Sequence, residues 1–186
     1  MTQKAFPLYV RTILAALVLS AIVVAPAGAS LAPGTSAPLF SAQASLGGKV
    51  FTFDLADALK KGPVVLYFYP AAFTQGCTLE AHDFADHIGD YKALDATVIG
   101  VSVDGIAKLQ KFSVSECRSK FPVASDADKK ISKEYDAVLQ LGPATYADRT
   151  SYVISPAGKV VYAYHALDYS KHVENTLAAL KKLEGK

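Results

Sequence analysis

The sequence predicts one domain of the α/β or α+β class, in which helices pack against a β-sheet. Two continuous apolar runs, PVVLYFYP at 63–70 and TVIGVSVD at 97–104, are typical of strands buried on both faces. Helical spacing of apolar residues follows each run, and a hairpin pattern and a last helix complete the chain. This order of elements indicates a layered sandwich. No internal repeat or low-complexity linker interrupts residues 30–186.

The first 29 residues have the pattern of a secretory signal. Lys4 and Arg11 precede an apolar run at 13–25, and the small residues PAGAS follow it. The run is short for a membrane span. We therefore expect residues 1–29 to be a signal peptide and the protein to be exported, in a bacterium to the periplasm. An uncleaved anchor is the alternative, and only then would a membrane be a partner.

The remaining chain divides into an extended leader at 30–37, rich in proline and small residues, and a folded domain at 38–186. Removal of 1–29 takes away two of the 19 basic residues and none of the 17 acidic ones, so the formal charge becomes zero. No basic run is visible, which argues against nucleic acid as a partner. Both cysteines, Cys77 and Cys117, lie in the exported part, where disulfides persist. Composition leaves a structural bridge and a redox pair equally open.

Each predicted strand has a local signal. The glycine pair at 47–48 predicts a turn into a strand that ends at Phe53, and the buried runs give strands at 63–70 and 97–103. The segment FPVASD at 121–126 predicts a short strand and a turn. The segment at 150–165 predicts a hairpin that turns at Pro156, Ala157 and Gly158.

The predicted helices are recognised by their apolar faces. In chain order they are a short turn at 54–62, 74–91 (face Ala81, Phe84, Ala85, Ile88, Tyr91), 105–118 (Ile106, Leu109, Phe112), 129–137, and 170–183 (Val173, Leu177, Leu180). Gly89 weakens the last turn of the second of these helices.

The stretch PAAFTQGCT at 70–78 carries the chemistry. Thr74 is a good N-cap type, and in Thr-x-x-Cys its hydroxyl is placed to accept the backbone N–H of Cys77. The sulfur then lies in the first helical turn, where unpaired N–H groups and the helix dipole favour a thiolate, the reactive form. Gly76 allows close approach, and Pro70 ends the strand and fixes the loop. The pattern predicts a pocket for a small electrophile.

These residues resemble the peroxiredoxin family. Pro70, Thr74 and Cys77 match its P-x-x-x-T-x-x-C motif, and TLEAHDF, VIGVSVD and RTSYVIS follow in the family's order. The similarity is strongest to the bacterioferritin-comigratory, or peroxiredoxin Q, branch, and it covers about residues 36–184. It implies a thioredoxin-like α/β fold with a central mixed sheet flanked by helices. It also implies a thiol-dependent peroxidase without a cofactor, which reduces hydrogen peroxide and organic hydroperoxides through a cysteine sulfenic acid.

The resemblance also assigns roles. Cys77 would attack the peroxide, Thr74 would hydrogen-bond the sulfur and the peroxide, and Pro70 would shield the sulfenic acid. Arg149 would stabilise the thiolate and orient the peroxide, and Glu80 would hold Arg149. Other interpretations remain open: Thr74 as a cap only, Arg149 as a surface residue at a strand end, and Glu80 as a partner of the helix dipole.

Resolution of the sulfenic acid is where the chain departs from the family pattern. His82 stands where many members of the branch carry a second cysteine. Cys117 lies at the end of the predicted helix 105–118, about one turn after the position of a resolving cysteine in other members, where this chain has Ser113. Cys117 could resolve the sulfenic acid. It could equally be a core thiol, with a thioredoxin-like protein or a small thiol as the direct reductant. The histidines are scattered, so we expect no metal site.

Two other functions share this fold. An exported thioredoxin-like thiol-disulfide protein needs Cys-x-x-Cys, and Thr74 occupies the first of those positions. A thioredoxin-fold binding module with a leftover thiol would need no catalysis at all. Its Cys77 would react slowly with hydrogen peroxide, and that rate separates it from a peroxidase.

Overall fold

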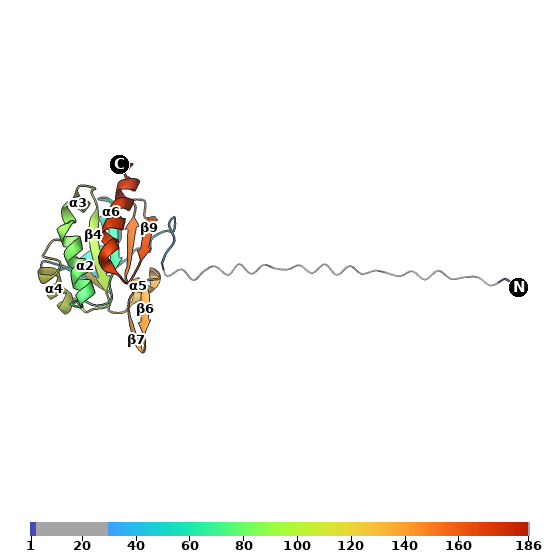
Figure 1. Cartoon of the computed structure of the whole chain (residues 1–186), viewed down its shortest axis with the longest axis horizontal. Helices are drawn as coiled ribbons and strands as arrows, with labels where there is room; N and C mark the ends of the chain where they lie inside the picture. Colours follow the sequence, from blue (N-terminus) through green and yellow to red (C-terminus); the bar gives the residue numbers. More distant parts are fainter. Residues whose placement is uncertain (3–29, 186) are drawn as a thin grey trace.

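A mixed β-sheet with helices on both faces forms the core of the protein (Figure 1). The computed structural model describes residues 1–2 and 30–185, so the predicted signal peptide lies outside the described residues. Within them, seven strands run in the order β2-β1-β5-β4-β3-β8-β9, and β6 pairs with β7 separately. The strands are β1 (Ser41–Leu46), β2 (Lys49–Asp54), β3 (Val64–Phe68), β4 (Thr97–Ser102), β5 (Val123–Ser125), β6 (Val138–Leu141), β7 (Ala144–Ala147), β8 (Thr150–Ile154) and β9 (Val160–His165).

The sheet confirms the predicted mixed architecture. Strands β3, β4 and β5 are parallel neighbours, whereas β8 runs antiparallel to β3 and β9 antiparallel to β8. Every residue of β3 and of β8 is buried. Strand β3 is thus a central strand, as its continuous apolar run predicts, and the chain that leaves its carboxyl end emerges between two layers of helices.

The helices lie in two layers. They are α1 (Leu55–Leu59), α2 (Gln75–Asp86), α3 (Ile88–Lys92), α4 (Ile106–Ser115), α5 (Lys130–Glu134), a 3₁₀ turn η1 (Tyr169–Lys171) and α6 (His172–Leu183). Alternate residues of β3 serve the two cores, because successive side chains of a strand point to opposite faces. Val65 and Tyr67 pack with α2, α4 and α6, whereas Leu66 and Phe68 pack with α1 and α5.

Several predicted helices are shorter than the sequence indicates: α1 and α5 each have only five residues, and the two long helices predicted before residue 120 both end early. The helix predicted at 74–91 breaks at His87, whose ψ of 8° leaves the helical region and whose ring binds the carbonyl of Asp83. The chain restarts as α3, and Tyr91 still reaches the core. The helix predicted at 105–118 ends at Ser115, so Cys117 lies beyond it, in a segment where Arg118 has a positive φ of 49°.

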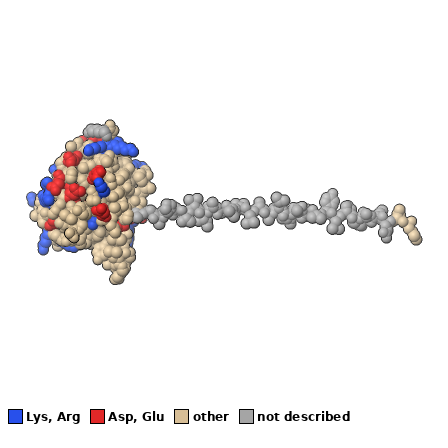
Figure 2. Space-filling view, viewed as in Figure 1, with Lys and Arg blue, Asp and Glu red and all other residues tan. Residues whose placement is uncertain are grey.

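Strand β1 and the β6–β7 hairpin were not predicted. Strand β1 has no alternating apolar pattern, and it is held between β2 and β5 by backbone pairing. The β6–β7 hairpin projects from the body of the protein and contains no charged residue, so it appears as an uncoloured knob in Figure 2. On the face shown there, acidic and basic side chains are interspersed. No helix in residues 30–185 is both long and apolar enough to cross a membrane.

Candidate active site around Cys77

Cys77 lies in the first turn of α2, directly after the loop that follows β3. Asp104, which follows the end of the neighbouring strand β4, fixes this loop, because its carboxylate accepts a hydrogen bond from the backbone N–H of Ala72 at 2.6 Å. Phe73 adopts a positive φ of 67°, which turns the chain into the helix. The thiol of Cys77 is almost completely buried, at 1% exposure. The sulfur is therefore shielded from solvent in the resting fold.

Thr74 occupies the N-cap position, but its side chain does not make the predicted contact. Its backbone is extended, with φ −78° and ψ 149°, as an N-cap requires. The hydroxyl, however, donates to the carbonyl of Ala71 at 2.9 Å, and no side-chain cap bond is formed. The prediction that this hydroxyl accepts the N–H of Cys77 is wrong: the side chain is turned toward the carbonyl of Ala71, to which it donates, and this rotamer directs the oxygen away from the helix start. Thr74 itself is exposed.

Arg149 is the charged partner of the sulfur. It immediately precedes β8, beside the end of β3, and its Nη2 lies 3.3 Å from Cys77 Sγ. Arg149 is buried, which excludes its interpretation as a surface residue. The space that the guanidinium occupies depends on Gly76, because a Cβ built on that residue would lie 3.3 Å from Nη2. Gly76 thus makes room for Arg149.

Glu80, one turn after Cys77 on α2, holds Arg149 from the other side. Its Oε2 accepts from Arg149 Nη1, and both side chains are buried. Burial raises the pKa of Glu80 to about 8, against the opposing effect of Arg149. Burial also disfavours the charged form of Arg149, but the charges of Glu80 and Cys77 outweigh it and raise the pKa of Arg149. The structure therefore brings Cys77, Arg149 and Glu80 into one chain of contacts.

Sequence reasoning missed two residues behind Glu80. His172, the first residue of α6, is fully buried, and its Nδ1 lies 2.8 Å from Ser151 Oγ and 3.8 Å from Glu80 Oε1. Burial lowers the pKa of His172 to about 4. A signal for Ser151 was present, since it follows Arg149 by two positions and so shares its face of the strand. No local pattern identified His172.

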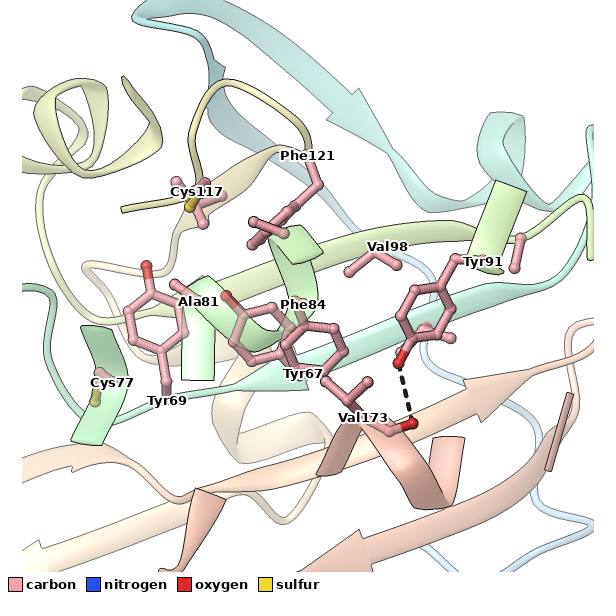
Figure 3. Packing of buried hydrophobic residues seen from close by; sticks show 14 of the residues in the cluster. Tyr67, Tyr69, Cys77, Ala81, Phe84, Tyr91, Val98, Cys117, Phe121 and Val173 are labelled. Atoms are coloured by element: carbon pink, nitrogen blue, oxygen red, sulfur yellow. Dashed lines mark hydrogen bonds between the residues drawn. The ribbon is translucent and has the colours of Figure 1, made fainter. Parts of the chain in front are cut away.

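Pro70 and Cys117 lie outside the chain of contacts that joins Cys77, Arg149 and Glu80. Pro70 lies half-buried in the loop before Cys77. Cys117 is fully buried in the same apolar cluster as Cys77, and Figure 3 shows the ring of Tyr69 between the two. Both cysteines are free thiols, so they do not form a structural bridge in this state. Burial raises the pKa of Cys117 well above its ordinary value, which keeps that thiol protonated and unreactive while the core is closed.

The described residues contain no cluster of three or more histidine, cysteine or carboxylate groups that could hold a metal ion. The arrangement at Cys77 is instead suited to chemistry at sulfur. A buried guanidinium adjoins the sulfur, the helix start supplies a positive dipole end, and a carboxylate fixes the guanidinium. Such a site stabilises a thiolate and any negative charge that develops on a small molecule next to it.

Comparisons with known proteins agree with this chemistry. The model of the AhpC/TSA family matches residues 33–163. Peroxiredoxin Bcp of Xanthomonas campestris is 30% identical over 145 residues, which cover 70% of this chain and 90% of that protein. The chloroplastic peroxiredoxin Q of Triticum aestivum is 38% identical over 125 residues, covering 67% of this chain and 57% of that protein.

Solved structures give the same result. The crystal structure of the peroxidoxin BcpB from Mycobacterium tuberculosis superimposes with a TM-score of 0.74 at 29% identity and covers 81% of this chain and 97% of that one. The structure of peroxiredoxin Q from Xanthomonas campestris has a TM-score of 0.67 at 29% identity, over 75% of this chain and 89% of that one. The fold is therefore thioredoxin-like, as expected.

Proposed function

The chain belongs to the AhpC/TSA family and is a peroxiredoxin, a thiol-dependent peroxidase, and we propose that Cys77 is the residue that attacks the peroxide. The observation that carries this proposal is the 3.3 Å contact between Cys77 Sγ and the buried Arg149. The only other cysteine, Cys117, makes no hydrogen bond or ion pair at its sulfur with a charged group of the described residues, and it lies within the apolar core. Of the two thiols, Cys77 alone adjoins a buried guanidinium.

The reaction follows from this geometry. The thiolate of Cys77 attacks the terminal oxygen of the peroxide, so an S–O bond forms as the O–O bond breaks. The products are a cysteine sulfenic acid and an alkoxide, or hydroxide from hydrogen peroxide, which takes a proton from water. Negative charge moves from sulfur to the departing oxygen during this step. Arg149, fixed by Glu80, is placed to stabilise that charge at both stages.

Thr74 and Pro70 complete the proposed site from the loop side. Thr74 is exposed, and its hydroxyl already donates a hydrogen bond to the carbonyl of Ala71 in the loop. A rotation of this side chain would redirect the hydroxyl toward a peroxide oxygen. Pro70, half-buried in the same loop, offers no N–H and limits the approach of water to the sulfenic acid.

The sulfenic acid must then be captured by a thiol before more peroxide drives it to sulfinic acid. One route is a disulfide with Cys117, which requires the start of α2 to unwind because both thiols are buried in the resting fold. The other route is direct capture by a thioredoxin-like protein or a small thiol. Intact mass after one equivalent of peroxide separates them: an internal disulfide loses two hydrogens relative to the reduced chain, whereas a sulfenic acid gains one oxygen.

The test of the proposed function compares two matched cysteine variants. Cys77→Ser should abolish thiol-dependent peroxide reduction, while Cys117→Ser should keep the first step, measured by stopped-flow with peroxide alone. Both substitutions replace a buried sulfur with oxygen, so they control for each other's effect on folding. Turnover that persists in Cys77→Ser would show that Cys77 is not the residue that attacks the peroxide.

We further propose export of the protein, to the periplasm of a bacterial cell, with a mature chain that begins at Ser30. The support is the order of charged, apolar and small residues over 1–29. N-terminal sequencing of protein from its native cell tests this. A chain that retains Met1 in membrane fractions would favour an anchor instead.

A further inference from the structure

Glu80 uses only one of its two oxygens on Arg149. Its Oε2 accepts from Arg149 Nη1, while Oε1 has no hydrogen-bond partner among the described residues. An end-on fork, the common geometry for an arginine and a carboxylate, would place Oε1 on Nη2. Here Nη2 is directed to the sulfur of Cys77 instead. Each Nη carries two N–H groups, so the direction of Nη2 toward the sulfur depends on how the carboxyl group holds the plane of the guanidinium.

The free oxygen faces His172. Glu80 Oε1 lies 3.8 Å from His172 Nδ1, and neither side chain is exposed. The other ring nitrogen, Nε2, lies 3.0 Å from the carbonyl of Ala166. A carbonyl oxygen can only accept, so Nε2 carries the proton and Nδ1 accepts the hydrogen bond from the Ser151 hydroxyl. The ring is therefore held in one orientation from both sides.

We propose that His172, with Ser151, is a positioning residue for the Cys77 site, an inference that rests on the proposed function of Cys77. The Nδ1 edge of the ring, which Ser151 holds in place, lies 3.8 Å from Glu80 Oε1. By occupying the space beside Oε1, the ring limits rotation of the carboxyl group and so fixes the plane of the Arg149 guanidinium. The Nη2 group of Arg149 consequently stays on the sulfur. Neither His172 nor Ser151 touches the reacting atoms.

A purely structural role for His172 predicts something different. His172 is also a buried anchor of α6, and a second anchor exists one turn later, where Thr176 Oγ1 lies 2.7 Å from Tyr91 Oη. If His172 only held α6 in place, loss of either anchor would have the same kind of effect. If His172 positions Glu80, only its own loss would change the reaction at Cys77.

Two amide substitutions at His172 distinguish the roles of the two ring nitrogens. Asparagine can place a polar atom near the position of Nδ1, whereas glutamine can place one near Nε2. We expect His172→Gln to lower the second-order rate constant with hydrogen peroxide about tenfold, on the scale of small misplacements in active sites. His172→Asn should recover most of that rate. Thr176→Val, the matched control, should lower the melting temperature but leave the rate per folded thiol unchanged.

Ser151→Ala provides a second variant if His172→Gln does not fold, and we expect it to slow the reaction about fivefold by releasing the ring. The ultraviolet absorbance of the thiolate should fall in the slow variants. In a Glu80→Gln background the difference between the asparagine and glutamine variants should disappear, because their common target is gone.

The inference is overturned if the two His172 variants react alike while Ser151→Ala matches the wild type. It is also overturned if Thr176→Val slows the reaction as much as His172→Gln. Failure of the proposed function looks different. In that case Cys77→Ser itself would retain turnover, whatever the His172 variants do.

Discussion

Substitution of Gly76 by alanine tests the site without removing any functional group. A Cβ at this position would lie 3.3 Å from Arg149 Nη2, which is closer than carbon and nitrogen comfortably approach. The guanidinium has little freedom to yield, because it is buried between Glu80 and Cys77. We expect Arg149 to shift away from the sulfur by a few tenths of an ångström and the reaction with peroxide to slow.

The size of the effect has two bounds. If the distance from Nη2 to Sγ grows from 3.3 Å to about 3.7 Å, the attraction between unit charges weakens by about 0.5 kcal/mol at an effective dielectric constant of about 20. That loss corresponds to a rate about twofold lower. If the charge-assisted hydrogen bond breaks, the loss is about 1.5–3 kcal/mol, or roughly tenfold to a hundredfold in rate.

The assay is the second-order rate constant with hydrogen peroxide in stopped-flow, together with the thiolate absorbance. Gly89→Ala is the matched control, since Gly89 also lies in a helix and a Cβ there meets nothing within 4 Å. Either substitution removes a helical glycine, which should add up to about 1 kcal/mol to the free energy of unfolding. Gly89→Ala should show that gain with an unchanged rate. A Gly76→Ala protein that reacts like the wild type would show that the Arg149 contact does not govern the reaction.

Three further predictions follow from the core. The hydroxyl of Tyr67 is buried without a partner among the described residues, whereas the hydroxyl of Tyr91 lies 2.7 Å from Thr176 Oγ1. Tyr67→Phe should therefore leave the midpoint of urea unfolding unchanged or raise it. Tyr91→Phe should lower the free energy of unfolding by about 1 kcal/mol, because it removes a buried hydrogen bond. Burial raises the pKa of Cys117, so the protonated thiol stabilises the fold fully below the unfolded thiol pKa of about 8.5, and this contribution is lost as the pH rises above it. In urea titrations at alkaline pH, Cys117→Ala should therefore show a smaller fall in the free energy of unfolding than the wild type. His82→Ala removes the contact of His82 with Glu116 and should speed formation of any Cys77–Cys117 disulfide, measured by rapid-quench peptide mapping. An unchanged rate would show that this contact does not restrain the opening of α2.

The sequence was sufficient wherever one local rule decided the structure. The runs at β3 and β4 are apolar on both faces, so no partner had to be known to assign them. The position of Cys77 in a first helical turn followed from the spacing of Thr74 alone. The Thr74 hydroxyl instead donates to the carbonyl of Ala71, and the rotamer that this bond selects is not visible in spacing.

Other features depend on contacts between distant segments. Strand β1 is a strand because β2 and β5 supply its hydrogen bonds, and its own residues do not favour that state. Helix α2 stops at His87 because the ring binds a carbonyl, although the apolar spacing continues to Tyr91. His172 joins the site only because α6 packs back against β8 and β9. Such residues become visible only when the tertiary fold is known.

Polar side chains tie the segment that carries Cys117 to the second half of α2. His82 Nε2 lies 2.8 Å from Glu116 Oε2, and Lys120 Nζ donates to the carbonyl of Ala85 at 2.9 Å. These ties hold the end of α2 and the Cys117 segment together, whereas Cys77 lies at the opposite end of the helix, before the first tie. A disulfide between the two cysteines would therefore form by unwinding of the helix start, while its tied half stays in place. The His82–Glu116 contact limits this unwinding to the residues before position 82, so its loss would let more of the helix open and would speed the release of Cys77 toward Cys117.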